Sequence, residues 1–447
     1  MSSRYAHVSL LAVLCLLFSG CSSSVSAGGG GGGGGNNNPT AVTFNFSGAA
    51  PAAVATAIGS GTFAAATVSS KAVTISVPVG TKSFAVAWVC QETGEGVSVT
   101  IQNVIEATTT DGTSYDLTCS APSSTGTSGT LTLSMDASAF SDPSAYPEFV
   151  QIVVENETYL SLGLPSGLVV DDYSLTAPAG SDRVDISVNG FNSLEGTSSA
   201  YMLAAKSFSG VAVPGSLNNG DTVTFTAADA TLEEPITYKN VPAGYGAPGA
   251  FAWVQPAGDQ YPFTLTEDGA TAYPALPATI AQSADVYHLS AESTGLTGVA
   301  TGQFVSEVEK FSGEGPATVT FPTPGHMSGP TPAALPTVDF SYSGFAGQTG
   351  VSDILSIQWT ASASTPLGPE TTDFYYTMTA SADYLSGATS LQLPDLSSIT
   401  GFIPDPASGT ELIWSAQTSQ NSAGSWPSSA VNSNEFSVGA SGEYLVP

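Results

Sequence analysis

The chain has 447 residues, with 37 Asp and Glu but only 7 Lys and Arg, so its formal net charge is -30. Seven basic side chains cannot form a phosphate-binding patch, which excludes nucleic acid as a partner, and a broad acidic surface would repel anionic lipid headgroups. Because charged residues make up only 10% of the chain, we expect a surface of mostly Ser, Thr, Asn, Gln and Gly.

Residues 1–20 have the pattern of a secretory signal peptide, in which Arg4 precedes a short apolar run over residues 8–18 that could not span a bilayer. The run leads into the sequence LFSGC, ending at Cys21, which resembles the lipobox of bacterial lipoproteins. The resemblance implies cleavage before Cys21, a lipid such as palmitate on that cysteine and, because Ser22 follows it, sorting to the outer membrane. The alternative is an ordinary signal peptide with a chance cysteine.

Residues 21–39 are rich in Ser, Gly and Asn and include an unbroken glycine run over 28–35. Such a segment cannot bury apolar surface and behaves as a flexible coil with a reach of roughly 25 Å. We expect it to be a tether that holds the rest of the chain off a membrane. The glycine run also matches the GxGxxG pattern of nucleotide-binding loops, but no predicted strand precedes it, so we reject that interpretation.

From residue 40 onward, short runs of alternating apolar and polar residues predict strands, and no long segment has the periodicity of a helix. Gly, Pro, Asn and Asp separate the runs, and Asp111-Gly112 predicts a hairpin between its two neighbouring runs. Many short strands with regular turns are typical of β-sandwiches or barrels. The clearest runs are 42–46, 72–77, 97–101, 131–135, 222–226, 317–321 and 374–379.

One phrase occurs four times, at 77–90, 175–188, 240–254 and 402–416. In each copy an apolar strand ends at a proline, a glycine closes a turn, and a second alternating strand departs. We expect each copy to be a hairpin that delivers large apolar side chains into a core. These side chains are Phe84, Val86 and Trp88, then Val184, Ile186 and Val188, and then Trp253 and Trp414.

The repeated phrase resembles the carboxypeptidase-regulatory-like and related immunoglobulin-like repeats of bacterial surface proteins, which are mostly non-catalytic. We therefore predict an all-β chain of tandem immunoglobulin-like β-sandwich domains that follow a signal peptide and a flexible Gly-rich tether. The predicted parts are 1–20 (signal peptide), 21–39 (lipidated Cys21 and tether), and four sandwiches over 40–120, 130–235, 236–336 and 337–447, with a linker over 120–129.

Cys90 and Cys119 are the two cysteines that remain once Cys15 has left with the signal and Cys21 is lipidated. Two such cysteines in an exported chain most often pair, and the disulfide would stabilise the first domain by roughly 3–4 kcal/mol. A metal site is the rival interpretation. Because the chain has no CxxC motif and neither cysteine has an adjacent histidine, we predict no metal and no cofactor.

Side chains suited to catalysis are scarce. His288 is predicted to be exposed on a strand and His326 to lie in a loop, and the GxSxG and HExxH motifs are missing from the sequence. Glu106, Glu307 and Glu309 lie on predicted strands, where alternation with apolar neighbours places them on the solvent face. We therefore predict that the protein is not an enzyme, and a glycoside hydrolase that uses two carboxyl groups is the least favoured alternative.

Exposed aromatic rings can stack on sugar faces, and the candidates are Trp426, Tyr261 and Tyr245, which lie in predicted turns or loops. The favoured function is that of a lipid-anchored, non-catalytic structural or adhesive protein of the bacterial cell envelope, in the outer membrane facing outward or in the periplasm. Its partners would be the membrane, through the lipid, and an envelope protein or a glycan. A carbohydrate-binding surface lipoprotein is the alternative.

Overall fold

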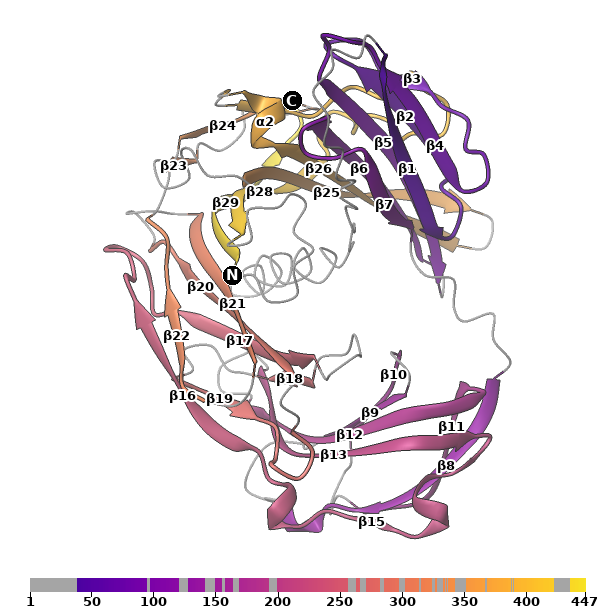
Figure 1. The fold of residues 1–447 in the computed structure, drawn as a ribbon, viewed down its shortest axis with the longest axis vertical. Helices are drawn as coiled ribbons and strands as arrows, with labels where there is room; N and C mark the ends of the chain where they lie inside the picture. The colour runs from indigo at the N-terminus through magenta and orange to yellow at the C-terminus, as the bar shows by residue number, and fades with distance from the viewer. Residues whose placement is uncertain are drawn as a thin grey trace. The chain divides into compact units, whose positions relative to one another are not determined.

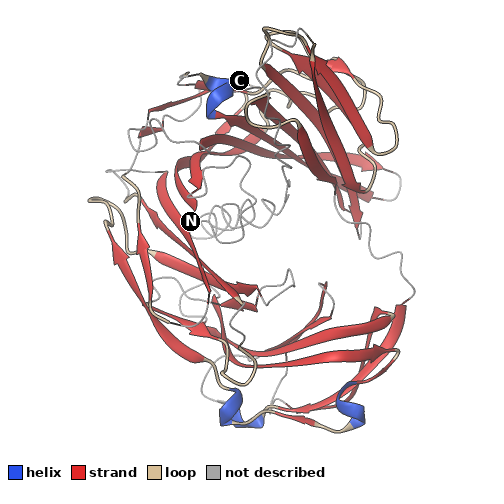
Figure 2. Cartoon of the chain, viewed as in Figure 1, coloured by secondary structure: helices blue, strands red, loops and turns tan. Residues whose placement is uncertain are grey.

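The structure is a computed structural model in which strands predominate and helices are few and short (Figure 2). The expectation of an all-β fold is therefore confirmed. The predicted signal peptide and tether lie outside the described residues. These run from 38 to 447 except for 95–96, 120–127, 141–148, 155–156, 164–168, 193–198, 256–262, 266–270, 282–284, 297–301, 313–314, 324–325, 328–332, 334, 336, 342–350, 366–367, 387, 389 and 422–434.

The chain divides into two compact units that are not consecutive in sequence. Unit 1 combines 1–122, 295–305 and 322–447, and unit 2 combines 123–294 and 306–321. The first and last predicted sandwiches therefore belong to one unit, while most of the second and third belong to the other. The division into four tandem domains stays a prediction.

The N-terminal part of unit 1 is a pair of packed sheets (Figure 1). The small sheet has the order β4-β1-β7, and in the larger sheet the order β6-β5-β2-β3 forms the opposing layer. The strands are β1 (Thr40–Gly48), β2 (Ala53–Ile58), β3 (Ala64–Ala65), β4 (Ala72–Val77), β5 (Ser83–Gly94), β6 (Val97–Thr108) and β7 (Ser114–Cys119). Three rings from three strands, those of Phe44, Phe84 and Tyr115, fill the space between the layers with centroids 5.6–5.9 Å apart.

The larger sheet of unit 1 continues from β6 through the order β26-β25-β28-β29. The β6–β26 pairing is parallel and runs from Val97 opposite Thr371 to Glu106 opposite Ala380. A second small sheet, β23-β24-β27, and one helical turn, α2, complete the unit. These elements are β23 (His326–Met327), β24 (Thr337–Ser341), β25 (Val351–Thr365), β26 (Gly368–Ser381), α2 (Ala382–Leu385), β27 (Ser390–Gln392), β28 (Glu411–Asn421) and β29 (Glu435–Leu445).

Unit 2 repeats the same layering twice. Its first small sheet, β11-β8-β14 with β15 also paired to β8, opposes β10-β9-β12-β13. Its second, β19-β16-β22, accompanies β18-β17-β20-β21. The strands are β8 (Ser128–Asp136), β9 (Phe149–Val154), β10 (Glu157–Gly163), β11 (Val169–Pro178), β12 (Gly180–Asn192), β13 (Ser199–Val213), β14 (Gly215–Ser216), β15 (Val223–Thr224), β16 (Leu232–Lys239), β17 (Gly249–Gln255), β18 (Phe263–Leu265), β19 (Ala272–Ala275), β20 (Val286–Thr294), β21 (Gln303–Ser312) and β22 (Ala317–Thr320), with short helices η1 (Ser138–Phe140), η3 (Leu217–Gly220) and η4 (Ala227–Asp229).

Three of the small sheets share one topological feature. In each, an early strand pairs in parallel with a strand from the end of the same segment: β1 with β7, β8 with β14 and β15, and β16 with β22. A parallel pair cannot be closed by a short turn, so each segment must pass through the opposing layer before it returns. The three segments thus share this parallel pairing of an early and a late strand.

The predicted hairpins are wrong, although a turn forms in the first, third and fourth copies, while in the second copy Gly180 already begins β12. The strands on either side of each proline-glycine phrase lie in different sheets: β4 and β5, β11 and β12, β16 and β17, and β27 and β28. The first turn is closed by the Thr81 N–H, which donates to the Pro78 carbonyl at 3.0 Å, and by Gly80 at a φ of 87°. Because the apolar faces of β4 and β5 point toward each other, the two strands form opposing layers and not neighbours in one sheet.

The large side chains delivered after these turns are buried as predicted in three copies. Phe84, Val86 and Trp88 are at most 3% exposed, Val184, Ile186 and Val188 are fully buried, and Trp414 is 6% exposed. The side chain of Trp253 lies outside the described residues. The Asp111-Gly112 hairpin is also wrong, because β6 and β7 belong to different sheets.

Strand β5 is buried on both faces, which explains its unbroken apolar sequence. Phe84, Val86 and Trp88 face the core shared with β1, β4 and β7. Ala87 and Val89 face a second core that they share with Tyr376, Met378 and other residues from the last part of the chain. Small residues on this second face allow that part to approach closely.

Candidate functional site

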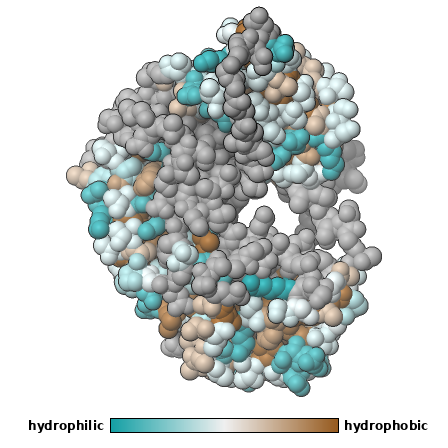
Figure 3. Space-filling view, in the orientation of Figure 1, coloured by the Kyte–Doolittle hydropathy of each residue, from teal (hydrophilic) through white to brown (hydrophobic). Residues whose placement is uncertain are grey.

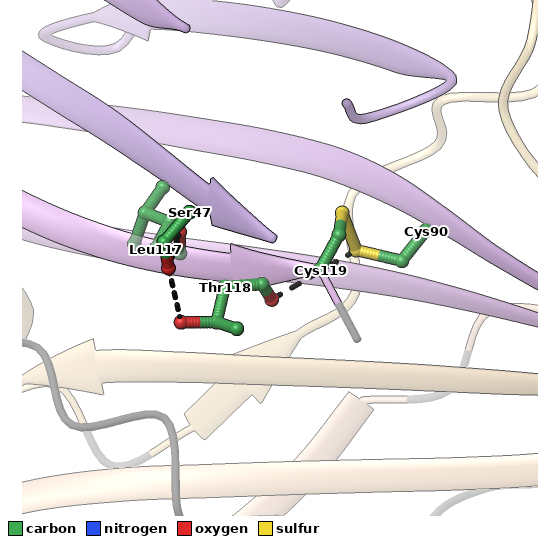
Figure 4. The surroundings of a disulfide bond; sticks show 5 residues. All are labelled: Ser47, Cys90, Leu117, Thr118 and Cys119. Carbon is green, nitrogen blue, oxygen red and sulfur yellow. Dashed lines mark hydrogen bonds between the residues drawn. A yellow bond between two sulfur atoms is a disulfide. The ribbon is translucent and has the colours of Figure 1, made fainter. Parts of the chain in front are cut away.

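The predicted disulfide between Cys90 and Cys119 is formed, and it joins the two layers of the N-terminal sandwich (Figure 4). Cys90 lies on β5 and Cys119 ends β7, with their Cα atoms 5.3 Å apart. Beside the bond, the hydroxyl groups of Ser47 and Thr118 are hydrogen bonded at 2.8 Å, which links β1 to β7. Both cysteines are buried in the core that contains Trp88, so the bond fastens the layers from the inside.

Most of the other predicted site residues cannot be placed. Cys21, Tyr261 and Trp426 lie outside the described residues. His326 begins β23, but its side chain is not described. The lipid anchor and the glycan-stacking role of all three rings therefore stay predictions, and only Tyr245 among the three rings is placed by the structure.

Tyr245 is described and lies in the turn between β16 and β17, where it is half-buried. Its N–H donates to the Pro242 carbonyl at 3.2 Å, and the next N–H, of Gly246, donates to the Thr294 carbonyl at 2.8 Å. Burial also raises the pKa of the Tyr245 hydroxyl above its usual value. The ring is thus carried by a turn that one backbone hydrogen bond, from Gly246 to Thr294, holds to β20.

Glu106 is not on a solvent face, contrary to the expectation. It lies on β6 with Val104 and Gln102 on the face that packs against the last part of the chain, and the Tyr384 hydroxyl donates a hydrogen bond to its carboxyl group. Burial raises the pKa of Glu106 from 4.5 to about 7. Alternation does not indicate exposure here because β6, like β5, is covered on both faces.

A polar network lies next to Glu106, where β6 ends. Oδ2 of Asp111 accepts hydrogen bonds from the Thr108 N–H at 2.7 Å, the Thr108 hydroxyl at 2.8 Å and the Ser381 hydroxyl at 2.6 Å. The Thr110 hydroxyl donates to Asp383 at 2.8 Å. Sequence reasoning missed this network, and the one local signal for it was Ser381, an N-cap residue type placed just before the short helix α2.

Glu307, Glu309 and His288 are also not on a solvent face. Glu307 is 3% exposed and His288 is 7% exposed, because β20 and β21 are covered on both faces. The Glu307 carboxyl accepts the N–H of Thr320, and the Glu309 carboxyl accepts that of Thr318. Burial raises the pKa of Glu307 from 4.5 to about 7 and also raises that of Glu309.

These two glutamates cover one edge of the small sheet β19-β16-β22. Strand β22 is at the edge of this sheet. Its side toward β16 is shown by the Phe321 N–H, which donates to the Lys239 carbonyl of β16. In a parallel pair alternate N–H groups point away from the partner strand, which places those of Thr318 and Thr320 at the outer edge. The carboxyl groups occupy the positions that carbonyl groups of a further strand would take, so they block strand addition there.

The outer faces of the small sheets are lined by short polar side chains that pair with each other across strands. Thr43 and Thr74 hydroxyls are 3.1 Å apart, and the Thr132 and Ser216 hydroxyls are 2.7 Å apart. In the space-filling view, hydrophilic and hydrophobic residues are interspersed over the described surface (Figure 3). Large exposed apolar residues are separated along the chain, namely Val79, Val169, Leu232, Val241, Leu296 and Leu445.

Among the described residues, His, Cys, Asp and Glu nowhere gather in a group of three that could hold a metal ion. The same part of the chain contains no helix with the length and apolar character of a membrane span. The arrangement thus defines an all-β protein of paired sheets, with a disulfide and buried carboxyl groups as its distinctive chemical features.

No protein-family model and no curated protein matches the chain. Among solved structures, a crystal structure of Salmonella alpha-2-macroglobulin reacted with methylamine is similar at 9% identity and a TM-score of 0.13. The match covers 93% of this chain and 40% of that one, so the chain spans less than half the length of that protein. A likeness of this level carries no argument about fold or function.

Proposed function

We propose that this is an exported, lipid-anchored protein of the bacterial cell envelope whose β-sheet body has a structural or adhesive role and no catalytic one. The observation that carries the proposal is the Cys90–Cys119 disulfide. Disulfides form and persist in oxidising compartments, which a chain reaches by export. The lipobox-like sequence before Cys21 supplies the route of export and the anchor.

The position of β1 supports a load-bearing role. It begins at Thr40, directly after the predicted tether, and it is the central strand of its sheet, paired with both β4 and β7. A pull on the tether would enter β1 at its amino end and would be resisted by two hydrogen-bonded ladders. The disulfide then couples β7 to β5 of the opposing layer, so the load spreads into both sheets.

Mass spectrometry and fractionation test the anchor. The full chain is expressed in a bacterium that processes lipoproteins, as wild type, Cys21→Ser and Cys15→Ser. We expect the wild type and Cys15→Ser to be in the membrane fraction, with an amino-terminal peptide that begins at an acylated Cys21, and Cys21→Ser to be unprocessed and unacylated. Unmodified Cys21 in membrane-purified protein would contradict the proposal.

Carbohydrate binding is a second candidate function, favoured by the way in which Tyr245 is held. The turn that carries it is fixed to β20 by the Gly246–Thr294 hydrogen bond, so a sugar could stack on the ring without first ordering a loop. The test is retention of the mature protein on a glycan array, with Tyr245→Ala and Trp426→Ala as variants. Binding that weakens in either variant supports this function, and no retention on any glycan dismisses it.

A further inference from the structure

One helical turn, α2, connects the end of β26 with the remainder of the C-terminal segment, and residues of the N-terminal segment hold it in place. Ser381, the N-cap of α2, donates to Asp111, and Asp383 in its first turn accepts from Thr110. Tyr384 reaches back to Glu106 on β6. Three side-chain contacts therefore join α2 to the end of β6 and the turn that follows it.

Among the side chains that make these three contacts, Glu106 is the one whose ionised form is disfavoured by its surroundings. Opposite it on the neighbouring strands are Ala85 of β5 and Ala380 of β26, neither of which can offer a hydrogen bond from its side chain. Among the described residues, the Tyr384 hydroxyl hydrogen bonds to the Glu106 carboxyl group, and no Lys or Arg side chain forms an ion pair with it.

The titratable groups that surround Glu106 do not compensate its charge. Tyr384 of α2 and Tyr376 of β26 both have pKa values raised by burial, so they stay neutral. Asp383 of α2 and Asp111 of the following turn are acidic, and Lys82, just before β5, is exposed. Ionisation of Glu106 thus adds a negative charge to a site with no neighbouring positive one.

We propose that Glu106 makes the contact of α2 with β6 a pH-sensitive latch, which stays closed while Glu106 is protonated and opens when Glu106 ionises, because the carboxylate then gains hydration that the Tyr384 hydrogen bond replaces only in part. The latch joins segments from the two ends of the chain, so its opening would weaken the attachment of the C-terminal strands to the N-terminal sandwich within unit 1. The Asp111–Ser381 contact limits the opening to a local event.

The sign of the effect follows from linkage. The pKa of Glu106 in the folded protein, about 7, is above its ordinary value of 4.5, so the folded state binds the proton more tightly. Its contribution to stability is complete below about pH 4.5 and is lost as the pH rises through 7. Opening of α2 should therefore increase roughly tenfold per pH unit between pH 5 and 7 and level off above 7.

Hydrogen–deuterium exchange of the full mature chain tests the latch, with rates corrected for the intrinsic pH dependence of exchange. Peptides that cover 376–386 are compared with peptides from β12 of unit 2 as an internal reference. We expect the wild type to show the rise between pH 5 and 7, and Glu106→Gln to show slow, pH-independent exchange. Glu443→Gln, an exposed change on β29 of the same unit, should behave as wild type.

Tyr384→Phe provides a second readout that a merely structural role would not produce. The Tyr384 hydroxyl lowers the pKa of Glu106, so its loss should move the midpoint of the pH transition upward. If Glu106→Gln does not fold, the upward shift of the pH midpoint in Tyr384→Phe is by itself the test of the proposal. A flat wild-type profile, an unchanged slope in Glu106→Gln, or an unmoved midpoint in Tyr384→Phe overturns the proposal.

Discussion

The Ser381 hydroxyl donates a 2.6 Å hydrogen bond to the carboxylate of Asp111, a residue 270 positions earlier in the chain. The same oxygen accepts the Tyr384 N–H at 3.1 Å and so caps α2. Ser381 is 1% exposed, and both of its hydrogen-bonding functions are used. One serine thus ends a strand, starts a helix and fastens the C-terminal segment to the N-terminal one.

Replacement of Ser381 by alanine should destabilise unit 1 by about 1–3 kcal/mol, because it leaves the Tyr384 N–H without its capping acceptor and removes a donor from the Asp111 carboxylate. The measurement is urea denaturation followed by tryptophan fluorescence. A double-mutant cycle with Asp111→Ala should give a coupling energy of about 0.5–3 kcal/mol. Ser76→Ala, on the exposed face of β4, is the control, and strictly additive effects would show that the contact contributes nothing.

Loss of the disulfide should lower the stability of unit 1 by roughly 3–4 kcal/mol, because the open chain gains the conformational freedom that the bond removes. The double variant Cys90→Ala/Cys119→Ala should have a lower urea midpoint than the wild type under oxidising conditions. Reductant should lower the wild-type midpoint toward that of the variant and leave the variant unaffected. A reductant effect on the variant would show that the difference has another origin.

Enlargement of Ala87 should be harmful, because Ala87 is fully buried on the second face of β5, in a core that also contains Leu393 and Ile403. We expect Ala87→Leu to cost about 1–3 kcal/mol through overpacking. Ala41→Leu, a matched change at an exposed position of β1, should have little effect on the urea midpoint. Equal tolerance of the two substitutions would mean that only one face of β5 is buried.

The stability of unit 2 should depend on pH through Glu307. Its pKa is about 7 in the folded protein against an ordinary 4.5, so its favourable contribution is present below about pH 4.5 and is lost as the pH rises through 7. Glu307→Gln keeps an oxygen acceptor for the Thr320 N–H but cannot ionise. Its thermal midpoint should therefore exceed that of the wild type at pH 8, and the difference should shrink toward pH 5.

Two further variants complete this test. Glu307→Ala leaves the Thr320 N–H without an acceptor and should be less stable than Glu307→Gln by about 1–3 kcal/mol at every pH, because neither variant ionises at this position. Glu233→Gln changes an exposed glutamate of β16 and should show no pH-dependent difference from the wild type. A difference between Glu307→Gln and the wild type that stays constant from pH 5 to 8 would contradict the assigned titration.

Local patterns predicted the elements of this protein but not their partners. Alternation identified strands such as β1, β4 and β8, and the proline-glycine phrase identified the turn at Gly80 and the burial of Trp88. The phrase was misread as a hairpin because the same turn chemistry serves two strands of one sheet or two strands of opposing layers. Which of these forms depends on where the distant strands pair, and no local residue encodes that.

The carboxyl groups illustrate the same limit. Alternation placed Glu106 and Glu307 on the solvent side, since a polar residue between apolar ones is exposed whenever a sheet is covered on one face only. Here other residues cover that side as well, and in the case of Glu106 they include Tyr384 of α2, from the C-terminal part of the chain.

The amino-acid sequence alone determined the all-β character, the positions of most strands and turns, and the pairing of Cys90 with Cys119, because these follow from local periodicity, turn chemistry and cysteine number. Only the tertiary structure decided that the two ends of the chain share one unit, that β6 pairs in parallel with β26, and that buried carboxyl groups lie at two contacts between strands. Those outcomes depend on which apolar faces are buried against each other, and that is a property of the whole chain.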